Sequence, residues 1–142
     1  MAEKEVKNID SLIDQGLNAE NNELDLREKE LDDEDLIKVL ESDKVKGVTA
    51  LFLEFNDIGD EGIKALVESD KMKFLTALNL FKNKVTDEGL KALAKSKNML
   101  NLSELILSDN EISLEGAKMV ATSNILGSLV SYGWETRLGM KV

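Results

Sequence analysis

The sequence predicts an α/β solenoid, in which short strands stack into one parallel sheet and helices cover one side of that sheet. Three observations predict this fold: a spacing of 27 residues that repeats along the chain, two hydrophobic periods within each unit, and the composition. The chain has 142 residues, of which 42% are apolar and 32% charged. This length and balance are typical of a single soluble domain with a substantial core.

Pairs of leucines two residues apart recur every 27 residues. The pairs are Leu24 and Leu26, Leu51 and Leu53, Leu78 and Leu80, and Leu105 and Leu107, and one further shift reaches Tyr132 and Trp134. Alternation with period two is typical of a short strand. Each unit continues with helical spacing, as in residues 87–96, where Leu90, Leu93 and Ala94 recur. Each unit is therefore expected to run strand, loop, helix, loop.

Further columns keep the same spacing. They are Asn56, Asn83 and Asn110; Gly62, Gly89 and Gly116; and Ser42, Ser69, Ser96 and Ser123. The asparagine amides are expected to be buried and to satisfy backbone groups where the chain leaves each strand. The glycines are expected early in each helix, where a side chain would hinder close approach of a neighbouring element.

These columns resemble the leucine-rich repeat family. The motif LxxLxLxxNx(I/V) occurs at residues 75–85 and 102–112, and at 48–58 it begins on Val. The helical half is similar to the ribonuclease-inhibitor-like subclass, and DEGxKAL is similar to repeats of some bacterial effectors. The resemblance implies a right-handed horseshoe arc with the sheet on its concave face and helices on its convex face. Ribonuclease inhibition is not implied, because the mammalian inhibitor is Cys-rich and far longer.

The whole chain, residues 1–142, is expected to form one leucine-rich repeat domain. Residues 1–23 would be an N-terminal capping helix and loop, with the helix over 3–15 and Gly16 at its end. Residues 24–128 would form four repeats of 27 residues, and 129–142 a truncated C-terminal repeat. Trp134, with Tyr132 beside it, would close the open end of the core.

Composition excludes several classes of function. The chain has no Cys and no His, which removes disulfides, zinc thiolate sites and Ser-His-Asp catalysis. No enzyme activity, cofactor or metal is expected. The net charge of −10 disfavours nucleic acid and anionic membranes as partners. No signal peptide or membrane-spanning run is visible, so a cytoplasmic location is expected, with secretion as an effector left open.

Acidic side chains gather in two runs, residues 32–35 and 57–61. Neither run has the spacing of a calcium loop. Both fall where helices are expected to begin, so a solvated helix-capping role is predicted, since acids there offset the helix dipole.

The concave face carries the candidate site, because the residues that alternate with the inward leucines point to it. Three of the four Phe of the chain fall in these columns. A cluster of aromatic side chains with Ile106 would make an apolar patch large enough to indicate an interaction. The candidate partner-binding residues are Phe52, Glu54, Phe55, Asn79, Phe81, Lys82, Ile106 and Asp109.

The function predicted from the sequence is non-enzymatic binding of a protein partner through this concave face. Acids around the phenylalanines predict a partner with an apolar knob ringed by Lys or Arg. Two alternatives stay open. The chain is a self-associating module that pairs through its C-terminal edge strand or concave patch, or it is a bacterial effector that acts on host proteins.

Overall fold

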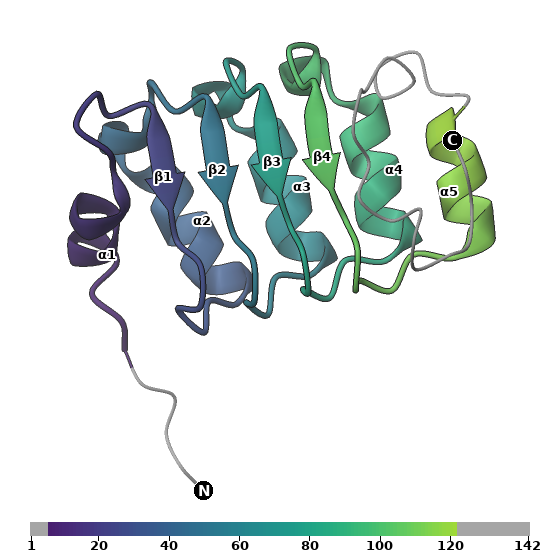
Figure 1. The fold of residues 1–142 in the computed structure, drawn as a ribbon, viewed down its shortest axis with the longest axis horizontal. Helices are drawn as coiled ribbons and strands as arrows, with labels where there is room; N and C mark the ends of the chain where they lie inside the picture. Colours follow the sequence, from purple (N-terminus) through teal and green to yellow (C-terminus); the bar gives the residue numbers. More distant parts are fainter. Residues whose placement is uncertain (1–5, 122–142) are drawn as a thin grey trace, which may run out of the picture.

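Four short strands form one parallel sheet in sequence order (Figure 1). The structure is a computed structural model that describes residues 6–121. The strands are β1 (Glu23–Asp25), β2 (Ala50–Phe52), β3 (Ala77–Asn79) and β4 (Glu104–Ile106). Their first residues are 27 positions apart, and the register aligns Leu24, Leu51, Leu78 and Leu105. The repeat read from the sequence is therefore confirmed across these strands.

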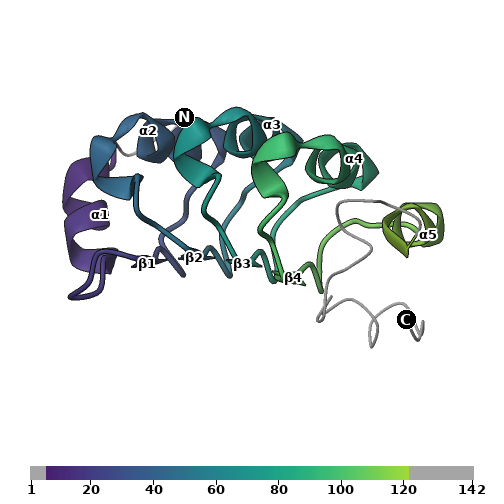
Figure 2. The same ribbon diagram turned by 90° about the horizontal axis from the view of Figure 1, so that it is seen from above.

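A helix follows each strand and packs on one side of the sheet. The helices are α2 (Asp33–Glu41), α3 (Asp60–Glu68), α4 (Asp87–Lys95) and α5 (Leu114–Ala121). Figure 2 shows α2, α3 and α4 as an outer layer that arches over the strands. The leucine pairs of the strands and the apolar faces of the helices are buried in one continuous core between the two layers. The expected α/β solenoid is confirmed.

The return from each helix to the next strand contains a short 3₁₀ turn that the sequence did not indicate. These turns are η1 (Asp43–Val45), η2 (Asp70–Met72) and η3 (Lys97–Met99). A column serine precedes each turn; the hydroxyls of Ser42 and Ser96 accept hydrogen bonds from the backbone two residues on, at 3.2 and 3.1 Å. The last residue of each turn is buried and extends the core.

The N-terminal helix is shorter than expected. Helix α1 spans Ile9–Gly16, and its N-cap is Asn8, whose side chain accepts a 3.0 Å hydrogen bond from the Ser11 backbone. An Asn side chain at the N-cap stabilises the start of a helix at that position, and this explains why α1 begins later than expected. Gly16 ends the helix as expected, but it is also the site of a close approach. A Cβ there would collide with the Asp25 carbonyl oxygen of β1.

The asparagine column has the buried structural role that the sequence predicts. Asn83 is 7% exposed. Its amide donates to the carbonyls of Leu53 at 2.9 Å and Leu80 at 3.2 Å, and its oxygen accepts a 2.9 Å bond from the Ile58 backbone. Each asparagine thus satisfies backbone groups of its own repeat and of the preceding one.

The glycine column makes room for a carboxylate from the preceding repeat. A Cβ at Gly89 would lie 2.5 Å from Asp60 Oδ1, and one at Gly62 would lie 2.6 Å from Asp33 Oδ1. Asp60 accepts hydrogen bonds from the backbone of Thr86 at 2.9 Å and Gly89 at 3.0 Å, at the start of α4. The acids therefore do cap helices, but Asp33, Asp60 and Asp87 cap the helix of the following repeat, and they are engaged rather than freely solvated.

The described residues test only some of the expectations from the sequence. Within residues 6–121, no helix is long and apolar enough to cross a membrane. The expectations for Tyr132, Trp134 and the truncated repeat 129–142 lie outside the described residues, as does the proposed pairing through the C-terminal edge strand.

Candidate interaction surface

The concave face is the surface of the sheet that turns away from the helices. Its first column contains Asp25, Phe52, Asn79 and Ile106, and all four are half-buried. Phe52, Asn79 and Ile106 line a shallow dent of about 30 Å³ together with Ala77 and Glu104. Asn79 also has a local role, because its Oδ1 accepts a 3.0 Å bond from the Phe81 backbone.

A second group lies where β2 and β3 end. The rings of Phe55 and Phe81 meet edge to face, with centroids 5.3 Å apart. Lys82 Nζ lies 5.6 Å from the Phe55 ring centroid, in a cation–π arrangement. No ring contact among the described residues joins Phe52 to this pair. The single aromatic cluster expected from the sequence is thus two groups, one over the strands and one beyond their ends.

The residue before each column asparagine adopts a left-handed backbone. The φ angles are 58° at Phe55, 55° at Lys82 and 58° at Asp109. Only glycine, and to a lesser degree Asn and Asp, adopts this region at small cost. A glycine would have been the usual sequence signal, and this chain has none at these positions. The turn aims the side chains of this column away from the core, and Phe55 is 44% exposed.

Glu54 is buried, although the sequence placed it among the exposed acids of the rim. It is 8% exposed, and its Oε1 has no hydrogen-bond partner within the described structure. Its Oε2 lies 3.7 Å from Arg27 Nε. Burial of the carboxyl group raises the pKa of Glu54, because desolvation disfavours the charged form. Alternation predicted the face correctly, but it could not predict how deeply neighbouring side chains cover this position.

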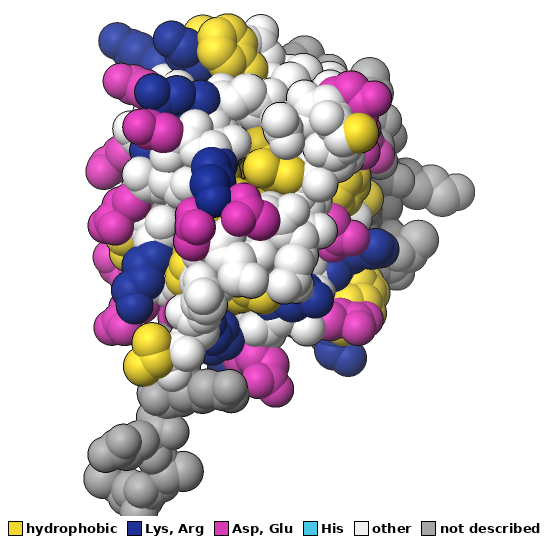
Figure 3. Space-filling model, turned by 90° about the vertical axis from the view of Figure 1, so that its left-hand side faces the viewer, with side chains coloured by type: hydrophobic (Ala, Val, Ile, Leu, Met, Phe, Trp, Pro, Cys, Tyr) yellow, Lys and Arg dark blue, Asp and Glu magenta, His cyan; other side chains and the backbone are white. Residues whose placement is uncertain are grey.

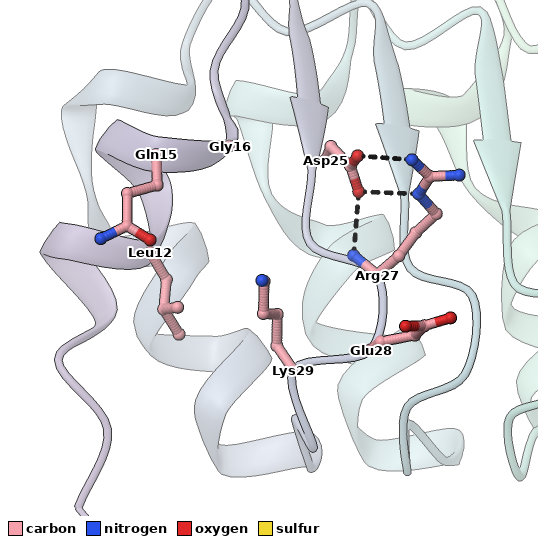
Figure 4. Close-up of a pocket in the computed structure, with 7 residues that line it drawn as sticks. All are labelled: Leu12, Gln15, Gly16, Asp25, Arg27, Glu28 and Lys29. Atoms are coloured by element: carbon pink, nitrogen blue, oxygen red, sulfur yellow. Dashed lines mark hydrogen bonds and ion pairs between the residues drawn. The ribbon is translucent and has the colours of Figure 1, made fainter.

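Arg27 is held mainly by Asp25 (Figure 4). Its Nε and Nη2 donate to the two Asp25 oxygens at 3.0 and 2.8 Å. Asp25 Oδ1 also accepts a 3.0 Å bond from the Arg27 backbone. The guanidinium holds the pKa of Asp25 below its ordinary value. This pair is exposed, with roughly half of each side chain in solvent.

Two adjoining cavities open beside this pair. One, of about 280 Å³, is lined by Gly16, Asn18, Glu23, Asp25, Arg27 and Phe52. The other, of about 410 Å³, lies between α1 and the residues after β1, and the Lys29 side chain extends into the space that Figure 4 shows there. The sequence did not indicate these cavities, since they depend on how α1 docks beside β1.

The N-terminal end of the solenoid is covered rather than open. Figure 3 shows acidic and basic side chains interspersed over this end, with only scattered hydrophobic ones. The backbone of Glu23 is paired with Asn18, whose N–H donates to the Glu23 carbonyl at 3.0 Å and whose Oδ1 accepts from the Glu23 N–H at 3.0 Å. The start of β1 therefore does not present free edge groups for another strand.

Two exposed apolar residues lie away from the concave columns. Phe74 is 53% exposed and Leu100 is 67% exposed, and both follow 3₁₀ turns. Lys73 Nζ lies 5.3 Å from the Phe74 ring centroid. The repeat pattern gave no reason to single them out, because their columns hold unrelated residue types in other repeats.

Comparison with protein families agrees with the geometry. Residues 48–67, 71–94 and 98–121 each match a family model described as Leucine Rich repeat. This chain carries leucine-rich repeats. The three matched leucine-rich repeats coincide with the units of β2, β3 and β4, and the first unit, which has Lys29 in the asparagine column, lies outside the matches. No curated protein matches the chain.

In the described part of the chain, no group of three or more acids has an arrangement that suits a metal ion.

Proposed function

We propose that the protein binds another protein through the concave face of its leucine-rich repeats. The observation that carries this proposal is Phe55. It is a large apolar side chain that is 44% exposed and has a φ of 58°. A non-glycine residue in this conformation costs roughly 1–2 kcal/mol. Lys82 and Asp109 adopt the same backbone, so this conformation belongs to the repeat, and what distinguishes Phe55 is that it places a large apolar ring in solvent at this position.

The surroundings of Phe55 support an interaction surface. Phe81 packs against its ring, and Phe52 and Ile106 stay half-buried on the same face. Aromatic side chains near the centre of an interface often contribute most of the binding energy. Leucine-rich repeat proteins generally act as interaction modules, and the helical second half of each unit supports the ribonuclease-inhibitor-like subclass for this chain.

The charges around these side chains favour a basic partner. Glu23 and Glu104 are exposed at the start of β1 and β4, and Asp109 follows β4. In the column that directly precedes the asparagines, the described residues are Glu28, Phe55, Lys82 and Asp109, and Lys82 is the basic one. A partner surface with an apolar knob flanked by Lys or Arg would match this pattern.

The test compares a double aromatic variant of the concave face with a single aromatic variant elsewhere in the full chain. Phe55→Ala with Phe81→Ala removes the aromatic pair of the concave face, whereas Phe74→Ala removes an equally exposed ring elsewhere. We expect the double variant to lose the partner that the wild-type chain captures by chemical cross-linking, and Phe74→Ala to keep it. Truncation of such anchors costs ~2 kcal/mol or more, about a thirtyfold loss of affinity.

Two results would be decisive against parts of this proposal. If the folded double variant captures the same partner with unchanged strength, the concave face is not the site. If light scattering shows a concentration-dependent dimer that the double variant abolishes, the partner is a second copy of this chain.

A further inference from the structure

Arg27 lies between the carboxylates of Asp25 and Glu54, and it forms hydrogen bonds only to Asp25. It makes two hydrogen bonds to Asp25, at 3.0 and 2.8 Å, and reaches Glu54 Oε2 only at 3.7 Å. A guanidinium has a fixed fork of donors, so it cannot bind two carboxylates bidentately on the same edge. Arg27 therefore leaves Glu54 without a close hydrogen-bonded cation.

Glu54 is the carboxylate that lacks a close partner. Its Oε1 is buried and has no hydrogen-bond partner in the described structure. Buried polar atoms without a partner are rare in proteins, and each one calls for an explanation. A short movement of Arg27, whose side chain is 55% exposed, would bring a donor closer to this carboxyl group.

Such a movement would leave Asp25 with Lys29 as its nearby cation, which is not within ion-pair distance, unless another one took the place of Arg27. The cavity of about 280 Å³ beside Asp25 offers room for a long side chain. Glu23, on its wall, has no ion pair among the described residues, and the half-buried ring of Phe52 lines the other side. Two carboxylates and an aromatic ring together suit the head of a Lys or Arg.

We propose that a protein partner on the concave face inserts a Lys or Arg side chain into this cavity, pairing with Asp25 and Glu23, while Arg27 turns from Asp25 to Glu54. This inference rests on the proposed function, since it assigns one contact of the same surface. It accounts for three observations together: the bidentate Asp25–Arg27 pair at an exposed position, the unpartnered oxygen of Glu54, and the cavity between them and α1.

The experiment uses peptides selected on the full chain from a random library displayed on phage. We expect the selected peptides to share a Lys or Arg at one position next to an apolar residue. Replacement of that residue by Gln, or the change Asp25→Asn in the protein, should each weaken binding by about tenfold, the size typical of a close charge pair. The two changes together should weaken it little more than either alone.

The variants are matched to separate charge from folding. Asn at position 25 keeps the oxygen that accepts the Arg27 backbone N–H. Glu88→Gln removes one negative charge from an exposed position on α4, in the helical layer away from the concave face, and should leave binding unchanged. A structure of the peptide complex should place Arg27 within hydrogen-bond distance of Glu54.

Different results would overturn the cation site and the proposed interface on the concave face. Peptides that depend on Phe55 and Phe81 but contain no shared basic residue, or are indifferent to Asp25→Asn, would overturn the cation site and leave the concave face in place. Peptides that bind equally to the Phe55→Ala, Phe81→Ala variant would overturn both.

Discussion

The first repeat and the inner repeats satisfy the free N–H groups at the start of their helices in different ways. Helix α2 is capped from within: Asp32 and Asp35 form a reciprocal capping box, and Lys7 Nζ lies 3.2 Å from Asp35. Helix α4 has a cap of its own at Thr86 and in addition receives the Asp60 carboxylate from the preceding repeat. Where α2 has Asp35, the later helices have Gly62, Gly89 and Gly116.

The difference shows what the repeated glycines are for. A helix N-terminus needs one carboxylate or hydroxyl to satisfy its free N–H groups. The chain has Val6 at the position 27 residues before Asp33, so no carboxylate comes to α2 from there, and Asp35 supplies one within the helix. An inner repeat borrows a neighbour's carboxylate, and the space for it exists only if the residue at that position has no Cβ. The asparagine column also links neighbouring repeats, because Asn56 accepts a hydrogen bond from the Lys29 backbone in the loop of the first repeat.

The largest effect is expected from Asn83→Ala, which removes the link between two inner repeats. Four hydrogen bonds disappear, and each buried backbone group that stays unpaired costs roughly 1–3 kcal/mol. The free energy of unfolding, measured by urea denaturation, should fall by about 3 kcal/mol or more. Asn101→Ala, which removes an exposed hydrogen bond to Lys73, is the control and should change it by less than about 0.5 kcal/mol. Equal effects would contradict the assigned role of the column.

A smaller loss is expected from Gly89→Ala, which would make an inner helix resemble the first one in lacking space for a neighbour. The new Cβ would lie 2.5 Å from Asp60 Oδ1 and 2.9 Å from Val85 Cγ1. Overpacking of this kind costs about 1–3 kcal/mol, and the gain in helix propensity of about 1 kcal/mol offsets part of it.

Gly47→Ala is the matched control for that change. The nearest atom to a Cβ at position 47 is the Asn21 carbonyl oxygen at 3.7 Å, an ordinary contact. Thermal unfolding should therefore show a clear drop in Tm for the Gly89 variant and almost none for the Gly47 variant. A Gly89 variant as stable as wild type would mean that Asp60 does not need this space.

The smallest effect concerns Glu54, at the junction of the first repeat with the second. Because the pKa of this carboxyl is raised in the folded state, the folded chain binds its proton more tightly than the unfolded chain. This contribution favours folding at acid pH and is lost as pH rises through the pKa of the folded state. Glu54→Gln removes this titration, so the stability of the variant relative to wild type should rise as the pH increases from about 4 to about 7. Urea denaturation at the two pH values measures this gain, with exposed Glu104→Gln for comparison; a gain that shrinks toward neutral pH would contradict the sign.

The sequence was enough to predict whatever depends on the period. The strands, the buried leucines and the asparagine column follow from spacing and residue type. It was not enough for features that depend on contact between repeats. The Asp60 carboxylate accepts a hydrogen bond from Gly89, which is 29 residues further along the chain, and no local sequence pattern predicts that contact.

The candidate site was predicted less completely than the fold. Alternation identified the face, yet the burial of Glu54 depends on how its neighbours cover it. The left-handed backbone of Phe55 has no glycine to signal it, and it turns this ring toward Phe81 and away from Phe52. The cavity beside Asp25 depends on the docking of α1, whose start at Asn8 the periodicity did not predict.

The two columns link neighbouring repeats in opposite directions along the chain. Each column asparagine serves the loop of the repeat before it, and each column aspartate serves the helix of the repeat after it. An inner repeat that opened would therefore leave unpaired groups on both sides. Solenoids are described as rows of units coupled to their nearest neighbours, and here the coupling is reciprocal. Fraying from one terminus should then be costly, so amide hydrogen exchange across β2 and β3 is expected to proceed through one concerted opening.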